Sequence, residues 1–296
     1  MNIKLLLGPM RLPFLILAPA CALLGIGTAE WEAGHVEVFQ VILVFIGAIA
    51  AHISVNAFNE YYDFKSGVDS RTHRTPFSGG SGTLQQHPEL SRMALVTAVV
   101  ALGITALIGV YFLFERGWGL LPLGLLGLFI IYAYTTWMVY NPILCLIAPG
   151  LGFGTFIVLG AHFALTGAYS WTAFFASLVP FFLVSDLLLL NQFPDAEADQ
   201  SVGRNHLPIR IGKRKSSYIY GVFLLGAYLA IGLGVILDKL PGAALLGLGT
   251  LILAVPAFMG ALRHAEDTGK LIPAMSMNVL VNILTPVLTA IGLFLS

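Results

Sequence analysis

The sequence predicts an all-α membrane protein, a bundle of nine transmembrane helices with two long cytoplasmic loops. Hydrophobic residues occupy 57% of the 296 positions, and the mean hydropathy is +0.87. Charged residues make up only 10%, whereas a soluble domain carries about 25%. Apolar stretches of about 20 residues, the length that crosses a bilayer, recur along the whole chain. These observations place the chain in a lipid bilayer.

Nine apolar spans follow one another. We expect them at residues 12–30, 38–58, 93–114, 119–137, 143–166, 171–192, 217–237, 242–261 and 272–295. Most connections between them are too short to hold a domain, so we expect a single membrane domain over 1–296. Only two connections are long, at about 59–92 after the second span and about 194–216 after the sixth.

The basic residues predict the orientation. Thirteen of the 15 Lys and Arg residues fall on the side that holds the N-terminus, and only Arg116 and Lys239 fall on the other. Because basic residues concentrate in cytoplasmic loops, we expect the N-terminus and both long loops in the cytoplasm of a prokaryotic cell and the C-terminus outside its inner membrane. The net charge of 0 gives no indication of a nucleic-acid partner.

The first long connection begins with NAFNEYYDFKSGVDS at residues 56–70. Polar side chains recur there at helical spacing and form one narrow stripe. The stripe consists of His52, Asn56, Asn59 and Asp63. Glu60 points off this stripe. Gly67 predicts the end of the helix, so that Asp69 returns as a loop residue.

The second long connection reads NQFPDAEADQSVGRNHLPIRIGKRKS over residues 191–216. Asn191, Asp195 and Asp199 recur every four residues and climb about 12 Å of one helix face. Glu197 points the other way, and we expect it to face solvent.

Two ladders of acids and amides repel each other unless something positive lies between them. Hard oxygen ligands without a His or Cys cluster favour Mg²⁺, which proteins hold with one or two carboxylates and substrate phosphates. The predicted metal ligands are Asn59, Asp63, Asp69, Asn191, Asp195 and Asp199. Basic residues in the same loops add ligands for oxyanions, so the pattern predicts a polyphosphate site. The predicted oxyanion contacts are Lys65, Arg74, Arg204 and, of the basic run 213–215, Lys213.

Several of these features have a second interpretation. His52 and Asn56 are candidate substrate contacts, but they are equally candidates for hydrogen bonds between neighbouring helices. Asp186 lies inside the sixth span, where an acid is either functional or a protonated acid bonded to another helix. The segment TPFSGGSGTL at 75–84 is either a phosphate-binding glycine nest or a flexible return loop.

The two motifs resemble those of the UbiA superfamily of intramembrane prenyltransferases, and the resemblance covers essentially the whole chain. That family carries N-x-x-x-D followed by a further Asp on helices 2 and 6 of a nine-helix bundle. The resemblance implies that Mg²⁺ on the two motifs binds a polyprenyl diphosphate, and that an aromatic acceptor captures the allylic cation left by ionisation. We expect Asp63 and Asp195 to be the central catalytic carboxylates, and Asp186 or His52 to serve as a base if either reaches the cavity.

The spacing Asp63-x-x-x-Gly67-x-Asp69 resembles the naphthoate branch of that family and favours 1,4-dihydroxy-2-naphthoate, the acceptor of menaquinone biosynthesis. Other branches resemble D-x-x-x-D. Pro194 and His206 replace residues typical of the naphthoate branch, so 4-hydroxybenzoate stays an alternative acceptor.

Two other classes compete with a prenyltransferase. A cation-coupled secondary transporter would use such acids near the bilayer midplane on interrupted helices, whereas these ladders lie at a membrane edge. The motif of a CDP-alcohol phosphotransferase resembles D-G-x-x-A-R, and no such stretch occurs in this sequence.

Overall fold

A computed structural model describes residues 7–72 and 74–296, and within them every regular element is a helix. The longer helices are α2 (Leu17–Ala33), α3 (Val38–Ser66), α5 (Ser91–Arg116), α6 (Leu121–Thr136), α7 (Pro142–Gly150), α8 (Leu159–Thr166), α9 (Trp171–Ser201), α11 (Lys213–Ile236), α12 (Leu251–His264) and α13 (Thr268–Phe294). Two shorter α-helices, α4 (Thr83–Gln86) and α10 (Leu207–Ile211), lie in the long connections. Lys4, one of the thirteen basic residues on the N-terminal side, lies outside the described residues.

The predicted all-α membrane fold is confirmed. Eight helices of the described chain are long and apolar enough to cross a membrane. α2 and the two 3₁₀ turns of Gly8–Phe14 meet at a bend of 55° and make a ninth span if the bent pair is counted as one. The first predicted span, 12–30, is therefore less regular than predicted, because residues 12–14 form a 3₁₀ turn and the α-helix begins only at Leu17, after the bend.

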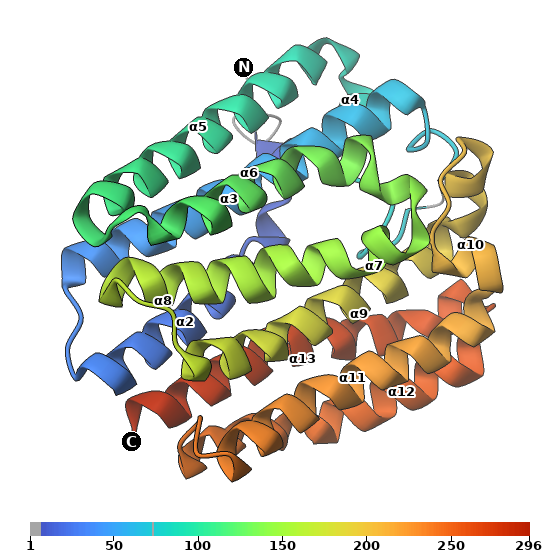
Figure 1. Ribbon diagram of the computed structural model, residues 1–296. Coiled ribbons are helices and arrows are strands. Elements are labelled where there is room, and N and C mark those ends of the chain that lie inside the picture. The colour runs from blue at the N-terminus through green and yellow to red at the C-terminus, as the bar shows by residue number, and fades with distance from the viewer. Residues whose placement is uncertain (1–6, 73) are drawn as a thin grey trace.

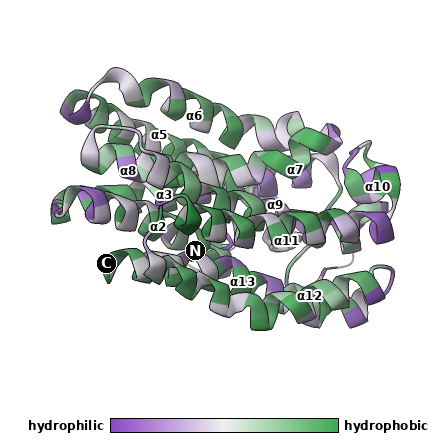
Figure 2. Ribbon diagram, turned by 60° about the horizontal axis from the view of Figure 1, so that its bottom comes forward, coloured by the Kyte–Doolittle hydropathy of each residue, from purple (hydrophilic) through white to green (hydrophobic). Residues whose placement is uncertain are grey.

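The helices lie side by side in one bundle (Figure 1). α3 packs against α5 on one side, while α9 packs against α7, α11 and α13. α9 is the central helix of the bundle. In its apolar stretch of 18 residues, 67% of the residues are buried inside the protein, compared with 17% in the span that contains α5. Apolar residues fill the middle of the bundle and polar residues gather at the helix ends (Figure 2).

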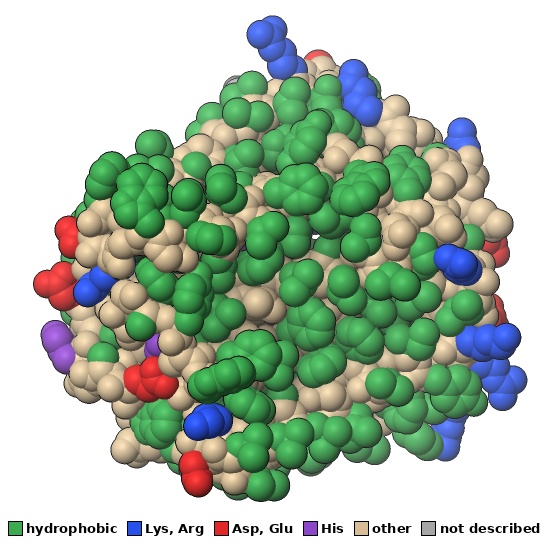
Figure 3. Space-filling view, in the orientation of Figure 1, with side chains coloured by type: hydrophobic (Ala, Val, Ile, Leu, Met, Phe, Trp, Pro, Cys, Tyr) green, Lys and Arg blue, Asp and Glu red, His purple; other side chains and the backbone are tan. Residues whose placement is uncertain are grey.

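The two ends of the bundle differ in charge. α10 lies at one end and the C-terminus at the opposite end (Figure 1). A broad hydrophobic face separates the ends, and Lys and Arg side chains gather at the end that holds α10 (Figure 3). This arrangement suits a protein that crosses a bilayer along the length of its helices.

α3 and α9 extend beyond the apolar runs predicted at 38–58 and 171–192. α3 continues to Ser66 and ends, as predicted, at Gly67, which has a φ of 73°. α9 continues to Ser201 through Pro194. Hydropathy detects only the part of a helix that lies in lipid, whereas the helical hydrogen bonds continue through the polar part. Both acidic motifs therefore project from helix ends.

Two further spans are less regular than predicted. The span expected at 143–166 consists of α7, a π-helical segment called η6 (Leu151–Val158) and α8, with Pro149 just before the π-helix. The span expected at 242–261 begins with the 3₁₀ segment η7 (Gly242–Thr250) and continues as α12. π-Helical turns frequently occur at functional sites, and η6 lines the cavity described next.

Candidate active site at the mouth of an apolar cavity

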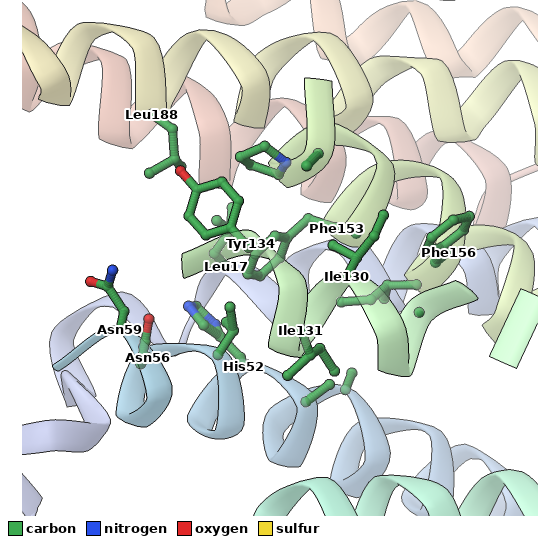
Figure 4. A pocket seen from close by; sticks show the side chains of 18 of the residues that line it. Leu17, His52, Asn56, Asn59, Ile130, Ile131, Tyr134, Phe153, Phe156 and Leu188 are labelled. Carbon is green, nitrogen blue, oxygen red and sulfur yellow. The ribbon is translucent and has the colours of Figure 1, made fainter. Parts of the chain in front are cut away.

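A cavity of about 490 Å³ lies between α3, α5, α6, α9 and the irregular span that contains η6. Apolar residues surround most of it, among them Phe112, Leu128 and Phe156. At one end, His52, Asn56 and Asn59 project from α3 toward the space that Tyr134 and Phe153 border from the facing helices (Figure 4). The cavity is therefore an apolar chamber with a polar mouth.

The polar mouth gathers both acidic motifs. All six predicted metal ligands line the cavity, namely Asn59, Asp63, Asp69, Asn191, Asp195 and Asp199. Three come from the end of α3 or the turn after it, and three come from α9. Glu197 is exposed and does not line the cavity, as its position on the helix predicts.

Arg204 joins the two motifs. Its guanidinium donates to the carboxylate of Asp63 and, at 2.8 Å, to Asp199 Oδ1. Burial alone would lower the pKa of Arg204, but the carboxylates of Asp63 and Asp199 outweigh burial and raise it above its usual range. His206 Nε2 lies 2.8 Å from Asp199 Oδ2. A fixed positive charge thus lies where the sequence predicts that one is needed.

Asp69 is held beside the glycine-rich loop, residues 75–84. Its Oδ2 accepts a hydrogen bond of 2.8 Å from Gln85 Nε2. A Cβ added at Gly80, whose φ is 70°, would stand 2.8 Å from the same oxygen. Burial raises the pKa of the Asp69 carboxyl above its usual range, and the neighbouring Glu60 adds to this shift.

The glycine-rich loop lies over the mouth. Ser78, Gly79 and Gly80 line the cavity, and Ser78 and Gly79 also lie beside Asp195 of α9. Arg71 Nη1 donates to the carbonyl oxygen of Ser201 at 3.2 Å, which ties the first long connection to the end of α9. The first long connection therefore contacts both motifs.

The oxygen ligands at the mouth fit Mg²⁺ in the company of a phosphate. Asn191 Oδ1 and Asp195 Oδ1 are buried and have no hydrogen-bond partner among the described residues. No group of three or more His, Cys, Asp and Glu side chains in residues 7–72 and 74–296 is close enough to hold a metal ion alone. Mg²⁺ is commonly bound by one or two carboxylates that share it with substrate phosphates, and that is the kind of ligand set present here.

The basic residues predicted to contact an oxyanion do not all reach the cavity. Arg204 lines it, whereas Lys65, Arg74 and Lys213 do not. Lys65 lies over the ring of Tyr61, with 5.7 Å between its Nζ and the ring centroid. Arg74 is exposed and donates to Gln85 Oε1 at 2.9 Å. These side chains belong to the charged surface around the mouth.

His52 and Asn56 line the cavity, but Asp186 does not. The ring of His52 packs edge-on against Phe153, with 4.6 Å between centroids. Asn56 Nδ2 donates to the carbonyl oxygen of Met10 at 3.0 Å, which is the structural alternative considered for it above. Asp186 is fully buried against α13, so it is not placed to touch a substrate in the cavity.

Sequence reasoning missed other polar groups at the mouth. Arg11 lines the cavity and Glu60 is fully buried beneath it. A basic residue before the first span is typical of a membrane anchor, so the position of Arg11 in the sequence does not indicate a role in the site. Gln192 and Cys145 also line the cavity, and Gln192 Nε2 lies 3.1 Å from the sulfur of Cys145. The apolar context of Cys145 conceals that contact in the sequence.

Known proteins resemble this chain in sequence. A 1,4-dihydroxy-2-naphthoate octaprenyltransferase of Bacillus subtilis (strain 168) is 28% identical over 267 residues, covering 88% of this chain and 83% of that protein. A 1,4-dihydroxy-2-naphthoate octaprenyltransferase of Escherichia coli (strain K12) is 27% identical over 306 aligned residues, covering 98% of this chain and 94% of that protein.

Solved structures share the fold. The apo structure of a UbiA homologue from Aeropyrum pernix K1 superposes with a TM-score of 0.73 at 17% identity, over 95% of this chain and 97% of that one. A UbiA homologue from Archaeoglobus fulgidus bound to DMAPP and Mg²⁺ gives a TM-score of 0.65 at 13% identity, over 98% and 99%. Residues 17–280 match the model of the UbiA prenyltransferase family. The chain is therefore an integral membrane prenyltransferase that belongs to the UbiA family.

Proposed function

We propose that this prenyltransferase moves a polyprenyl group from a polyprenyl diphosphate to 1,4-dihydroxy-2-naphthoate in a Mg²⁺-dependent step of menaquinone biosynthesis. The observation that carries the proposal is the meeting of the α3 and α9 motifs, with Arg204 between them, at the mouth of an apolar cavity. Such a mouth suits a charged head group, and the chamber behind it suits a long apolar tail.

In this proposal the mouth binds the diphosphate. The six oxygen-bearing side chains of the two motifs would hold Mg²⁺ together with the diphosphate, and the ion would neutralise charge on the leaving group. Arg204 faces the same space and would take a diphosphate oxygen. As the bond between the allylic carbon and oxygen breaks, negative charge grows on the diphosphate. Groups fixed around it therefore stabilise the transition state more than the ground state.

The chamber has two roles in the proposal. Its apolar walls bind the prenyl tail, because burial of apolar surface is worth about 25 cal/mol per Å². Aromatic rings that line it, including Tyr134, Phe153 and Phe156, surround the allylic cation. Their faces attract a cation, and their bulk keeps water away from it.

The acceptor is inferred from the first motif and from the relatives. Gly67 provides the turn that returns Asp69 to the cavity, and both bacterial relatives described above are 1,4-dihydroxy-2-naphthoate octaprenyltransferases. The ring carbon that bears the carboxylate would attack the allylic cation. The new carbon–carbon bond forms as carbon dioxide leaves and its bonding pair restores aromaticity. His52, which lines the cavity, is the candidate base that keeps the ring hydroxyl electron-rich.

A competition assay tests the proposal. Purified protein receives one prenyl diphosphate, Mg²⁺ and equal amounts of 1,4-dihydroxy-2-naphthoate and 4-hydroxybenzoate. We expect a demethylmenaquinone-type product and release of pyrophosphate that stops when Mg²⁺ is chelated. Exclusive use of 4-hydroxybenzoate would overturn the acceptor. Absence of Mg²⁺-dependent pyrophosphate release with either acceptor would overturn the reaction itself.

A further inference from the structure

A basic side chain from the start of the chain enters the cavity wall. Of the Lys and Arg residues in the described chain, only Arg11 and Arg204 line the cavity. Arg204 already bonds to an acid from each motif. Arg11 comes from the bend before α2, where its φ of 52° turns the chain. That backbone conformation is costly for a residue with a Cβ, so the surrounding contacts must hold it in place.

Arg11 has one protein partner and several unused donors. Its Nε donates to Glu60 Oε1 at 2.7 Å, and its side chain is 22% exposed. A guanidinium carries five N–H donors, and the other four make no hydrogen bond to a described residue. The head group lies near enough to Asp63, Asp69 and Asp195 for its charge to act on their carboxyls. It therefore faces the space where the acidic motifs meet.

Glu60 fixes Arg11 and the glycine-rich loop with one buried carboxylate. Its side chain is fully buried. Besides Arg11, it accepts hydrogen bonds from Ser81 N at 2.6 Å and from Ser81 Oγ at 2.8 Å. One carboxylate thus joins the N-terminal bend, the end of α3 and the loop over the mouth. Three charge-assisted or buried hydrogen bonds of this kind hold their geometry well, because leaving any of them unmade inside the protein is costly.

We propose that Arg11 is a substrate-binding residue that takes an oxyanion at the cavity mouth, and that Glu60 is a positioning residue for Arg11 and the loop. The oxyanion is the diphosphate of the prenyl donor or the carboxylate of the acceptor, both of which rest on the function proposed above. A planar fork with free N–H groups suits either one, since both present paired oxygens. Arg11 and Arg204 would then be the two guanidinium groups of the binding site.

Steady-state kinetics of the full chain test the role of Arg11. Arg11→Gln and Arg11→Lys are compared with Arg92→Gln, which removes an exposed charge at the start of α5. We expect Arg11→Gln to lower kcat/KM by about 10- to 100-fold, the loss of a charge-assisted hydrogen bond, and Arg11→Lys to recover only part of it. A rise in the KM for prenyl diphosphate alone identifies the diphosphate as ligand. A rise for the acceptor alone identifies its carboxylate.

A binding measurement separates this inference from the proposed reaction. Isothermal titration of inorganic pyrophosphate in Mg²⁺ needs no prenyl transfer, so it remains informative if the wild-type chain transfers nothing. We expect Arg11→Gln to weaken pyrophosphate binding about 10-fold or more when the diphosphate is the ligand. Unchanged pyrophosphate affinity together with unchanged KM values for both substrates would overturn the role of Arg11. If the wild-type chain shows no activity, a variant Arg11→Gln that binds pyrophosphate as tightly as the wild type would overturn the role of Arg11 as well.

Limited proteolysis tests the role of Glu60. Arg74 is exposed in the loop that Glu60 anchors, so trypsin cleavage after Arg74 reports how firmly the loop is held. We expect Glu60→Ala to accelerate this cleavage several-fold and to weaken pyrophosphate binding, with Glu60→Gln between it and the wild type. Glu197→Gln, which removes an exposed carboxylate from α9, is the matched control. If Glu60→Ala changes neither cleavage nor pyrophosphate binding, Glu60 has no positioning role.

Discussion

Asp63 and Arg204 lie 141 positions apart in the sequence and form an ion pair at the mouth of the cavity. The pair connects the end of α3 to the segment that follows α9. The same guanidinium holds Asp199 at 2.8 Å, so one cation neutralises an acid from each motif. The two helix ends can therefore approach closely although both carry carboxylates.

Removing Arg204 should make the protein's stability depend on Mg²⁺. Arg204→Gln leaves Asp63 and Asp199 without their shared cation, and we expect a loss of about 1–3 kcal/mol, below the value for a fully buried pair because the arginine is partly exposed. Mg²⁺ should restore part of that loss, since it takes the place of the missing charge. Thermal unfolding in detergent with and without Mg²⁺ measures both effects, with the exposed Arg263→Gln as control. Equal stabilisation of wild type and Arg204→Gln by Mg²⁺ would contradict the prediction.

The two central carboxylates should be indispensable for turnover. Asp63→Asn and Asp195→Asn keep the side-chain shape but remove the charge that binds Mg²⁺, and we expect each to lower kcat at least about 100-fold in a folded protein. Glu197→Gln removes a charge from the exposed side of α9 and should be nearly silent. Prenyl transfer at limiting Mg²⁺ provides the measurement. Normal activity of Asp195→Asn under that condition would exclude it as a metal ligand.

A methyl group should impair activity at Gly80 of the glycine-rich loop but not at Gly203, which follows α9. Gly80 and Gly203 have φ values of 70° and 83°, so alanine is similarly strained at both, by about 1–2 kcal/mol. Only at Gly80 does the new Cβ meet a neighbour, 2.8 Å from Asp69 Oδ2, whereas Gly203 has open space. We expect both variants to lose similar stability and only Gly80→Ala to lose activity. Equal activities for the two variants would mean that the position of Asp69 is unimportant.

The chamber should set the length of the prenyl chain that the protein accepts. Gly152 of η6 lines the cavity, and a Cβ there meets nothing within 4 Å. Gly152→Leu should occupy space used by the tail and lower kcat/KM for long polyprenyl diphosphates by about 5- to 150-fold, the cost of overpacking, while a five-carbon donor is affected less. Gly103→Leu faces outward from α5 with equally open space and is the control. A uniform loss over all donor lengths would argue against this role for the chamber.

The C-terminus should lie outside the cell and both motifs should face the cytoplasm. The motifs and the C-terminus occupy opposite ends of the bundle (Figure 1), and the basic side chains gather at the motif end (Figure 3). A reporter enzyme that is active only outside the cytoplasm, fused after Ser296, measures the orientation. Activity of a cytoplasmic reporter at that position would instead place the motifs outside.

The sequence by itself determined the class of protein, eight of the spans and the two helix faces that carry the predicted site. A bilayer demands apolar stretches of a set length, and the spacing of Asn191, Asp195 and Asp199 places them on one helix face wherever that helix packs. Gly67 is likewise a local signal, because only the backbone conformation of the residue itself is at issue. These are properties of neighbouring residues, so the sequence alone was enough to predict them.

The partners across the site were decided only by the tertiary structure. Arg11 meets Glu60 across 49 positions and Arg204 meets Asp63 across 141, whereas Lys65, which stands two residues from Asp63, points away from the cavity. Charge and loop position look alike for all these basic residues in the sequence. Which of them enters the cavity depends on how α3, α9 and the N-terminal bend pack together, and that packing follows from many contacts between segments far apart in the chain.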